Sequence, residues 1–459
     1  MSIAHLRLET VTEALGAFTR LYGGDPYAFL CESLGDAGRN RYSFFGGRPT
    51  RIHRSHAAEI TIEHLDTGET LEGSKDLLDS LRTLLSACEP LPATPPFSSG
   101  VVGYLGYDVV RRFERLEGSP QDPEGLPDSI LFVPSEIVIV DHQLGTTDIV
   151  VHGSENASRL DVIRSQLQGP GAVPGAGSGG RASVPLEPRT KRSTFEAGVN
   201  TLLEHIRAGD IFQGVLSQRF ETPFNQDPLD LYRVLRKTNP APYMYFLRFG
   251  PDHAVLGSSP EVLVSLDERR ALTRPLAGTR PRGETAAADE ALALDLLNDP
   301  KERAEHVMLI DLARNDLGRV CEYGSVHVTR QFGIERHARV MHIVSEVEGT
   351  LRSDRDALDL FRATFPAGTV TGAPKIRAME ILDSLEPVRR GLYGGAIGYL
   401  DASGSMDLCL AIRTIVIHRG RALLQAGAGV VADSDPGREF EETVAKASAL
   451  VRALEHLSQ

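Results

Sequence analysis

The pattern of apolar and polar positions predicts strands in both halves of the chain. Apolar residues recur at alternate positions in residues 58–64 and form a denser run at 130–140, as strands of a partly buried sheet do. Residues 394–400, 408–418 and 421–426 follow one another closely, with glycine in the short gaps between them. These three stretches therefore predict strands joined by hairpins.

Three other stretches have helical spacing. Residues 77–85, 299–317 and 435–454 carry apolar residues at intervals of three and four. Asp299 can cap the second of these helices, with Pro300 as its first residue. Because many strands look hairpin-connected rather than separated by helices, we expect the α+β class with mainly antiparallel sheets.

One stretch of unusual composition divides the chain. Residues 168–183 read QGPGAVPGAGSGGRAS and contain almost no side chain that could be buried. We therefore predict an N-terminal part over residues 1–167, a linker or loop over 168–187 and a C-terminal part over 188–459.

Composition narrows the range of partners and locations. The 459 residues include 49 Lys and Arg against 62 Asp and Glu, which gives a formal net charge of -13. Phosphate and anionic lipid are bound by clustered basic side chains, so neither nucleic acid nor a membrane surface is an expected partner. No apolar run approaches the roughly 18 residues that span a bilayer, and the first 15 residues show neither an apolar signal core nor a basic leader, so we expect no membrane span and no signal sequence. The four cysteines form no CxxC pair, so we predict a cytoplasmic protein without a disulfide framework.

Two predicted helices begin with the same arrangement of acidic residues. Glu302 and Glu305 are three residues apart, and so are Glu439 and Glu442, so each pair lies on one helix face. Acidic residues also favour helix N-termini, and each pair alone is compatible with a structural role. The alternative is that both pairs converge on a hard divalent cation such as Mg²⁺, which prefers carboxylate oxygens.

Two further polar residues lie in apolar surroundings. Arg413 follows the apolar run 408–412, so its charge needs a partner, which could be a structural carboxylate or an anionic ligand. His342 lies within the run VMHIV and is either a core histidine or an acid–base group. The glycine-rich run 425–429 fits a close backbone approach to a ligand as well as it fits a tight turn.

A series of motifs runs from residue 209 to residue 446 in the order typical of one enzyme family. They are 209–219 (GDIFQGVLSQR), 239–244 (NPAPYM), 258–261 (SSPE), 274–280 (RPLAGTR), 305–320 (EHVMLIDLARNDLGRV), 342–349 (HIVSEVEG), 365–375 (FPAGTVTGAPK), 394–399 (GGAIGY) and 425–446. Through these motifs the C-terminal part resembles the chorismate-utilising enzymes, and most closely the large subunit of anthranilate synthase. The N-terminal part resembles them more loosely, at 30–33 (LCES), 41–46 (RYSFFG) and 103–108 (GYLGYD).

The resemblance implies a fold, a reaction and a cofactor. The fold would be a large layered α/β/β/α sandwich of two mainly antiparallel sheets with flanking helices. The reaction would convert chorismate and ammonia to anthranilate and pyruvate, the first committed step of tryptophan biosynthesis, with Mg²⁺ required. By motif position, Glu305 and Glu442 would bind the metal directly, and Glu302 and Glu439 would act mainly through water.

The resemblance also implies roles around the substrate. Glu261 matches the carboxylic acid that protonates the departing hydroxyl, and His342 matches the histidine linked to pyruvate elimination. The other implied contacts are Tyr393, Arg413, Lys446 and the backbone of Gly427 and Gly429 for the enolpyruvyl carboxylate, Thr279 and Thr369 for the ring and its carboxylate, and Ala277 and Gly278 beside them.

Two positions distinguish members of the family. Enzymes that add water have a lysine base where this chain has Gln213, so isochorismate and salicylate synthases are disfavoured. Many aminodeoxychorismate synthases have a nucleophilic lysine where this chain has Ala277, so amination by external ammonia is favoured. Aminodeoxyisochorismate synthase and aminodeoxychorismate synthase component I remain alternatives. A non-catalytic regulatory homologue is a further alternative, which the complete set of matched residues opposes.

The resemblance implies a protein partner and a regulator. The length leaves no room for a fused glutaminase, so we expect ammonia from a separate glutamine amidotransferase subunit. Tryptophan is the usual feedback inhibitor of the family, bound where the N-terminal part meets the core. The matching pocket residues are Glu32, Ser33, Pro242, Tyr243 and Met244, with Cys31 in place of the usual leucine.

Overall fold

The computed structural model describes residues 3–34, 41–91, 95–118, 120–153, 156–168, 187–337 and 339–457. The predicted linker over residues 168–187 falls outside these ranges except at its two end residues, and the three-part division of the chain stays a prediction. None of the described helices is long and apolar enough to cross a membrane.

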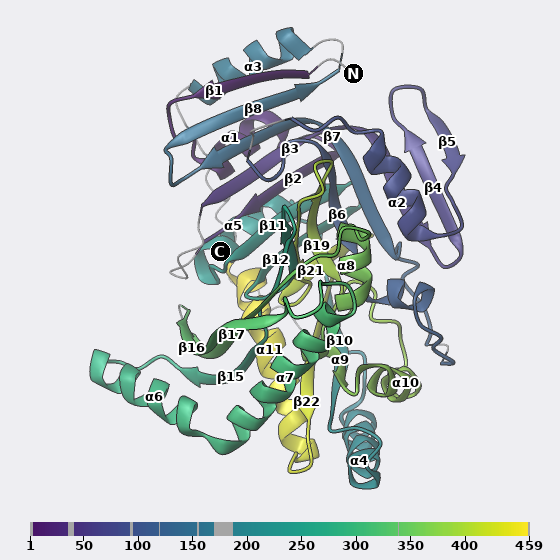
Figure 1. The fold of residues 1–459 in the computed structure, drawn as a ribbon, viewed down its shortest axis with the longest axis vertical. Coiled ribbons are helices and arrows are strands. Elements are labelled where there is room, and N and C mark those ends of the chain that lie inside the picture. The colour runs from purple at the N-terminus through teal and green to yellow at the C-terminus, as the bar shows by residue number, and fades with distance from the viewer. Residues whose placement is uncertain are drawn as a thin grey trace.

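Strands and helices are mixed along the whole chain (Figure 1). The strands are β1 (Ile3–Leu8), β2 (Tyr27–Glu32), β3 (Tyr42–His56), β4 (Glu59–His64), β5 (Glu69–Glu72), β6 (Gly100–Leu105), β7 (Ser129–Asp141), β8 (Thr146–His152), β9 (Glu187–Pro188), β10 (Gln213–Pro223), β11 (Tyr243–Phe249), β12 (His253–Ser259), β13 (Val262–Asp267), β14 (Arg270–Thr273), β15 (Leu276–Pro281), β16 (His327–Arg336), β17 (Val340–Thr350), β18 (Gly372–Ala373), β19 (Ala396–Asp401), β20 (Met406–Leu410), β21 (Thr414–His418) and β22 (Arg421–Val430). The helices are α1 (Ala14–Tyr22), α2 (Leu77–Ser86), α3 (Asn156–Gln168), α4 (Arg192–Ala208), α5 (Pro228–Thr238), α6 (Ala286–Asn298), α7 (Pro300–Gly318), α8 (Ala357–Thr364), α9 (Gly368–Thr371), α10 (Lys375–Leu385) and α11 (Pro436–Leu457), with a 3-10 helix η1 (Tyr107–Arg112).

The long strands β3 and β7 form the centre of the strand network. They pair antiparallel along their whole length, with a shift in register between Pro49 and Arg51. Before this shift β3 also pairs with β2, and after it with β4. Strand β7 likewise pairs with β6 through its first half and with β8 through its second half. Two series of strands therefore diverge from this one pair.

The two series connect the N-terminal and C-terminal halves of the chain. One continues from β2 through β11, β12, β21 and β22 to β10. The other continues from β6 through β19, β20, β13 and β14 to β17, which also pairs with β15 and β16. Every pairing between two described strands is antiparallel, so the predicted α+β class with mainly antiparallel sheets is confirmed. The separation into two facing sheets stays a prediction.

Buried apolar side chains form three large clusters within the described residues. One contains side chains from both strand series, such as Phe29 and Leu247 from the first and Val102 and Ile397 from the second. A second cluster joins α1, α5 and α11 to strands of the first series, including β11, β12 and β22. A third joins α2, α7 and α8 to strands of the second series, including β13, β19 and β20. Each series is therefore covered by its own set of helices.

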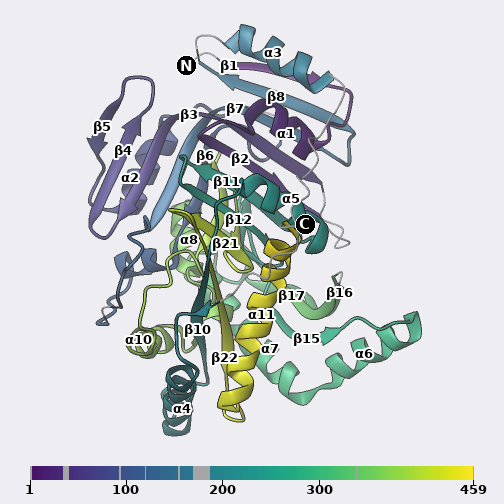
Figure 2. The same cartoon turned by 180° about the vertical axis from the view of Figure 1, so that it is seen from behind.

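The predicted helices form where the sequence indicated them. Helix α7 begins at Pro300, and the Asp299 carboxylate accepts hydrogen bonds from the backbone N–H groups of Lys301 and Glu302. Helix α2 is capped by Asp76 in the same way. Helix α11 buries Ala447, Leu450 and Leu454 against the sheet, and Figure 2 shows it lying along β22 and β10.

The prediction of one strand over residues 408–418 is wrong. Strand β20 ends at Leu410 and β21 begins at Thr414, with Arg413 in the left-handed region at φ 51° between them. The backbone carbonyl of Arg413 accepts a hydrogen bond from the N–H of Ser258, which holds this conformation. Non-glycine residues rarely adopt positive φ, so the apolar pattern alone did not indicate the break.

Phe29 tests the cluster shared by the two strand series. Its ring is fully buried, with centroids 6.0 Å from Phe97 and 6.1 Å from Phe132. We expect Phe29→Ala to lower the free energy of unfolding by about 3–5 kcal/mol, because the cavity it leaves cannot fully close. Chemical denaturation measures this loss, with Tyr323→Ala on the exposed surface as the control. Equal stability of both variants would contradict this packing.

Candidate active site

Helices α7 and α11 bring the four predicted carboxylates close enough for their charges to act on one another. Glu302 and Glu305 lie in the first turns of α7, and Glu439 and Glu442 lie in the first turns of α11. Burial raises the pKa of Glu305, and the charges of Glu302, Glu439 and Glu442 raise it further. Burial and Glu442 raise the pKa of Glu439 as well. Since these groups act on one another across two helices, the two acidic pairs converge.

Cations pair with three of these carboxylates. Lys446 Nζ lies 2.7 Å from Glu442 Oε1, Arg280 Nη1 lies 3.6 Å from Glu302 Oε1, and Lys301 Nζ lies 3.9 Å from Glu305 Oε1. In this arrangement no three His, Cys, Asp or Glu side chains of the described ranges are grouped as metal ligands. The donor set nevertheless fits Mg²⁺, because a divalent cation binds carboxylate oxygens and would relieve the mutual repulsion that raises the pKa of Glu305.

Glu261 is a buried carboxyl group between β12 and β13. It is 6% exposed, and Thr369 of α9 donates a hydrogen bond of 2.9 Å to its Oε1. Burial raises the pKa of Glu261 to about 8, although the Thr369 hydrogen bond and the charge of Arg413 both lower it. Glu261 is therefore a neutral carboxylic acid near pH 7 and can donate a proton.

Arg413 lies near Glu261 without forming an ion pair with it. Burial lowers the pKa of Arg413, and Glu261 is the group that opposes this. No described side chain accepts a hydrogen bond from the guanidinium. A half-buried guanidinium in this state is suited to bind a carboxylate with its two parallel N–H groups. The structure therefore favours the anion-binding interpretation of Arg413 over a structural ion pair.

His342 of β17 is held in one tautomer by the neighbouring strand β15. Its Nδ1 lies 2.8 Å from the carbonyl oxygen of Gly278, which can only accept, so Nδ1 carries the proton. Thr279 Oγ1 lies 3.2 Å from the same nitrogen. Burial and then the charge of Arg413 lower the pKa of His342 to about 3. Nε2 is buried and has no hydrogen-bond partner among the described groups, so the neutral imidazole presents a free, unprotonated nitrogen.

Tyr393, Lys446 and the glycines of β22 form another side of the site. Lys446 Nζ donates a hydrogen bond of 2.9 Å to the carbonyl of Gly427. A Cβ at Gly427 would lie 2.6 Å from Tyr393 Oη, so only glycine admits the tyrosine here. Burial raises the pKa of Tyr393 to about 12, so its hydroxyl is a neutral donor.

The remaining predicted residues lie on strands that border this site. A Cβ at Gly429 would lie 2.9 Å from Nε2 of Gln213, whose Oε1 is buried and finds no partner in the described part of the chain. Ala277 of β15 pairs with Ile343 of β17. Gly278 adopts φ 67°, and a Cβ there would lie 2.9 Å from Glu302 Oε2. Strand β15 thus lies between the imidazole and the carboxylates.

Electrostatic effects connect the separate parts of the site. Arg413 and Lys446 both lower the pKa of His342, and Glu261 raises the pKa of Tyr393. The proton donor Glu261, the neutral base His342 and the two cations Arg413 and Lys446 therefore lie around one region. His342 comes from β17 and Lys446 from α11, and the other two lie in connections between strands.

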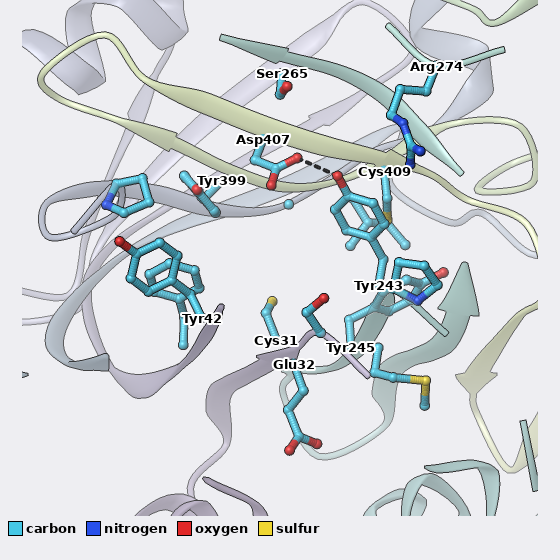
Figure 3. A pocket seen from close by; sticks show the side chains of 17 residues that line it. Cys31, Glu32, Tyr42, Tyr243, Tyr245, Ser265, Arg274, Tyr399, Asp407 and Cys409 are labelled. Carbon is cyan, nitrogen blue, oxygen red and sulfur yellow. Dashed lines mark hydrogen bonds between the residues drawn. The ribbon is translucent and has the colours of Figure 1, made fainter. Parts of the chain in front are cut away.

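The five residues predicted to bind tryptophan line one separate cavity of about 230 Å³ (Figure 3). Its wall includes strands from both strand series and from both predicted parts of the chain. Tyr243 Oη donates a hydrogen bond of 2.9 Å to Asp407 Oδ1 across this cavity. The predicted members are Glu32, Ser33, Pro242, Tyr243 and Met244, which lie together with Cys31.

The Glu32 carboxylate does not face the other labelled cavity residues. It accepts two hydrogen bonds of 2.9 Å from the guanidinium of Arg236 and one of 2.7 Å from Tyr232. Figure 3 shows the carboxylate pointing away from Tyr243 and Asp407. Its charge is therefore used within the protein, and Glu32 fixes the end of β2 rather than offering a charge to a ligand.

Sequence reasoning missed Arg274, which lines both this cavity and the space beside Glu261. Its guanidinium donates hydrogen bonds to Glu335 and, at 3.1 Å, to Glu346. The only signal was its position at the start of the 274–280 motif. Asp407 was also missed, and its place on β20 carries no signal in a single sequence.

The fold and these residues define the class of protein. The sequence pattern of the chorismate binding enzymes matches residues 38–452, and the chain belongs to this family.

Within the family the chain is similar to anthranilate synthase component 1, and the predicted resemblance is confirmed. It is 43% identical over 473 residues to the protein of Acinetobacter calcoaceticus, covering 98% of this chain and 94% of the relative. It is 46% identical over 449 residues to that of Pseudomonas putida, covering 94% and 90%. The crystal structure of anthranilate synthase component I from Streptococcus pneumoniae TIGR4 superimposes with a TM-score of 0.81 at 37% identity, covering 95% of this chain and 96% of that one.

The charge state of Glu261 predicts a dependence of stability on pH. Between pH 4.5 and about 8 the folded protein keeps a proton that the unfolded chain has lost, so this group makes the wild type less stable as pH rises. Glu261→Gln removes that effect. We expect the variant to gain stability relative to the wild type across this range, by at most about 1.4 kcal/mol per pH unit.

Denaturation of both proteins at several pH values measures this difference. Glu72→Gln on the exposed strand β5 serves as the control and should show no such trend. A constant difference between Glu261→Gln and the wild type would contradict a neutral Glu261.

Proposed function

We propose that this protein is the large subunit of an anthranilate synthase, a lyase that converts chorismate and ammonia to anthranilate and pyruvate. The proposal rests on three groups of the candidate site. Glu261 is a neutral acid, His342 is a neutral base, and Arg413 is a cation without an ion-pair partner among the described residues. The relatives named anthranilate synthase component 1, at 43% and 46% identity, support the same activity.

Arg413 and Lys446 bind and orient the substrate in this proposal. Chorismate carries two carboxylates, and the guanidinium of Arg413 holds the enolpyruvyl carboxylate together with Lys446 and the Tyr393 hydroxyl. Thr369 and Thr279 border the ring. Binding in a buried site fixes the orientation of the ring and excludes water.

Proton transfers by Glu261 and His342 complete the reaction. Ammonia attacks C2 of the ring while the 4-hydroxyl takes the proton of the Glu261 carboxylic acid and leaves as water, and the new ammonium group returns a proton to the Glu261 carboxylate. The free Nε2 of His342 then removes the proton from C2, the ether bond breaks, the ring becomes aromatic, and the leaving enolpyruvate takes the proton from His342 and becomes pyruvate. Gln213 offers no base that could activate water, so ammonia is the nucleophile.

We propose Mg²⁺ as the cofactor, held by Glu305 and Glu442 with Glu302 and Glu439 around them. When bound there, the ion would supply a Lewis acid for the ring carboxylate, which the glutamates alone would repel. The convergence of the four carboxylates supports this assignment.

The test of the function is direct. The protein is incubated with chorismate, Mg²⁺ and a high concentration of ammonium near pH 8, where Glu261 still carries its proton in part, and the fluorescence of anthranilate is followed. Consumption of chorismate to an amino-diene without anthranilate would instead favour aminodeoxyisochorismate or aminodeoxychorismate synthase. No consumption would favour a non-catalytic regulatory homologue.

Glu442→Ala tests the carboxylate cluster. We expect turnover to fall at least about 100-fold, because the loss of a metal ligand removes several kcal/mol of stabilisation from the transition state. Circular dichroism checks the fold, and Glu441→Ala, one position away on the exposed face of α11, is the matched control. Mg²⁺-dependent activity at the wild-type level in Glu442→Ala would refute the role of Glu442.

We further propose that the N-terminal part is regulatory and that the 230 Å³ cavity binds tryptophan. Its aromatic and small side chains suit an indole, and its wall joins the two parts of the chain.

A separate glutamine amidotransferase subunit would supply the ammonia, as the designation component 1 of the relatives suggests. The cluster shared by both strand series supports the inner layers of an α/β/β/α sandwich.

Ser265→Phe tests the cavity. Ser265 lies on β13 in the cavity wall, and a phenyl ring there would occupy the space (Figure 3). We expect the tryptophan concentration for half-inhibition to rise at least about tenfold while uninhibited turnover is kept, because an overfilled cavity excludes the ligand. Ser86→Phe, at the exposed end of α2, is the control. Unchanged inhibition in Ser265→Phe would place the tryptophan site elsewhere.

A further inference from the structure

A buried ion pair lies beside Tyr393, between the candidate site and α10. The guanidinium of Arg390 donates hydrogen bonds of 2.7 Å to both oxygens of Glu386. Their side chains are 2% and 7% exposed. Glu386 Oε1 also accepts hydrogen bonds of 2.8 Å from the N–H and the hydroxyl of Ser217 on β10. The pair therefore joins the end of α10 to the middle of β10.

The remaining donors of Arg390 reach the backbone next to substrate-binding positions. Nη1 donates a hydrogen bond of 2.6 Å to the carbonyl of Val370, the residue that follows Thr369 in α9. Nη2 donates one of 2.7 Å to the carbonyl of Val215, whose register partner on β22 is Gly429. One guanidinium thus fixes two peptide groups that belong to different sides of the site.

The same guanidinium also lies against two aromatic rings. Its central carbon is 4.6 Å from the ring centroid of Tyr107 and 5.7 Å from that of Tyr393. A cation near an aromatic face is attracted to the ring electrons, most strongly where water is excluded. Arg390 therefore restricts the ring of Tyr393 as well as the backbone of α9 and β10.

Burying an ion pair is an inefficient way to gain stability, because both charges lose their hydration. Replacing a buried ion pair with apolar residues of similar size is often neutral or stabilising. An apolar pair lacks the directed N–H groups of a guanidinium. A lysine also lacks them, because its ammonium group does not present a planar fork of N–H donors. The geometry of Arg390 thus suits the placement of its neighbours.

We propose that Arg390 is a positioning residue for catalysis, which holds the Thr369–Glu261 pair and the Tyr393 ring in register with the glycines of β22. This inference rests on the proposed function. Arg390 itself does not touch the substrate and acts through Thr369 and Tyr393.

Arg390→Lys is the test, because it keeps the charge and removes the fork. We expect kcat for anthranilate formation to fall about 100-fold, as a misplacement of about 1 Å does elsewhere. We also expect KM for chorismate to rise, since Tyr393 loses its support. The alkaline limb of the pH profile should move to higher pH, because Thr369 lowers the pKa of Glu261 and would no longer be held in place.

Two comparisons separate positioning from a merely structural role. Thr369→Val should move the alkaline limb in the same direction, and combining it with Arg390→Lys should move the limb no further. Arg389→Lys is the matched control, because the guanidinium of this neighbour pairs with Asp128 and Asp122, at 3.4 and 3.8 Å, which are not residues of the candidate site. Wild-type kinetics in Arg390→Lys, or additive shifts in the double variant, would overturn the inference.

Two further outcomes are also decisive. If Arg390→Lys does not fold, Glu386→Gln weakens the same hydrogen-bonded pair and is judged by the same pH profile.

If the wild type forms no anthranilate, the proposed function fails. The inference is then judged by NMR titration of the Glu261 carboxyl carbon, whose midpoint should be higher in Arg390→Lys and the same in Arg389→Lys. An unchanged midpoint in Arg390→Lys would overturn it.

Discussion

The burial of Glu261 near Arg413 is the constraint on which the rest of the site depends. In water these two groups would form an ion pair. Here desolvation favours the protonated carboxyl, and the hydrogen bond from Thr369 holds it in place. The neutral acid leaves the charge of Arg413 available, so one region contains both a proton donor and a binding group for an anion. Burial and the same cation lower the pKa of His342 and keep its Nε2 unprotonated.

The fold makes this arrangement possible by joining distant segments. The bent pair β3 and β7 starts two strand series, and the second delivers β17 and β15 while the first delivers β22 and β10. Helices α7 and α11 then supply four carboxylates that repel one another and thereby favour a divalent cation. Arg390 connects α9 to β10 through directed hydrogen bonds. In this proposal these bonds hold Glu261 and Tyr393 in fixed positions relative to each other.

Local features of the site could be predicted from the sequence, and non-local ones could not. The start of α7 was predictable because Asp299 and Pro300 act on the first turn alone. The left-handed turn at Arg413 was missed because a distant residue, Ser258, holds it. The orientation of Glu32 was missed for the same reason, since Arg236 lies far along the chain. Recognition of family motifs supplied the candidate residues, but only the fold brings them together.

The central claim is that Glu261 is a neutral acid at the pH of turnover, and its titration can be observed directly. Glutamate labelled with ¹³C at the carboxyl carbon gives NMR signals that move on ionisation, and the signal missing from Glu261→Gln identifies this residue. The structure predicts a midpoint near pH 8, with the carboxyl still protonated where exposed glutamates are ionised. A midpoint near 4.5, the ordinary value, would mean that Glu261 is charged and paired with Arg413. That result would contradict the assignment of the acid and of the free cation together.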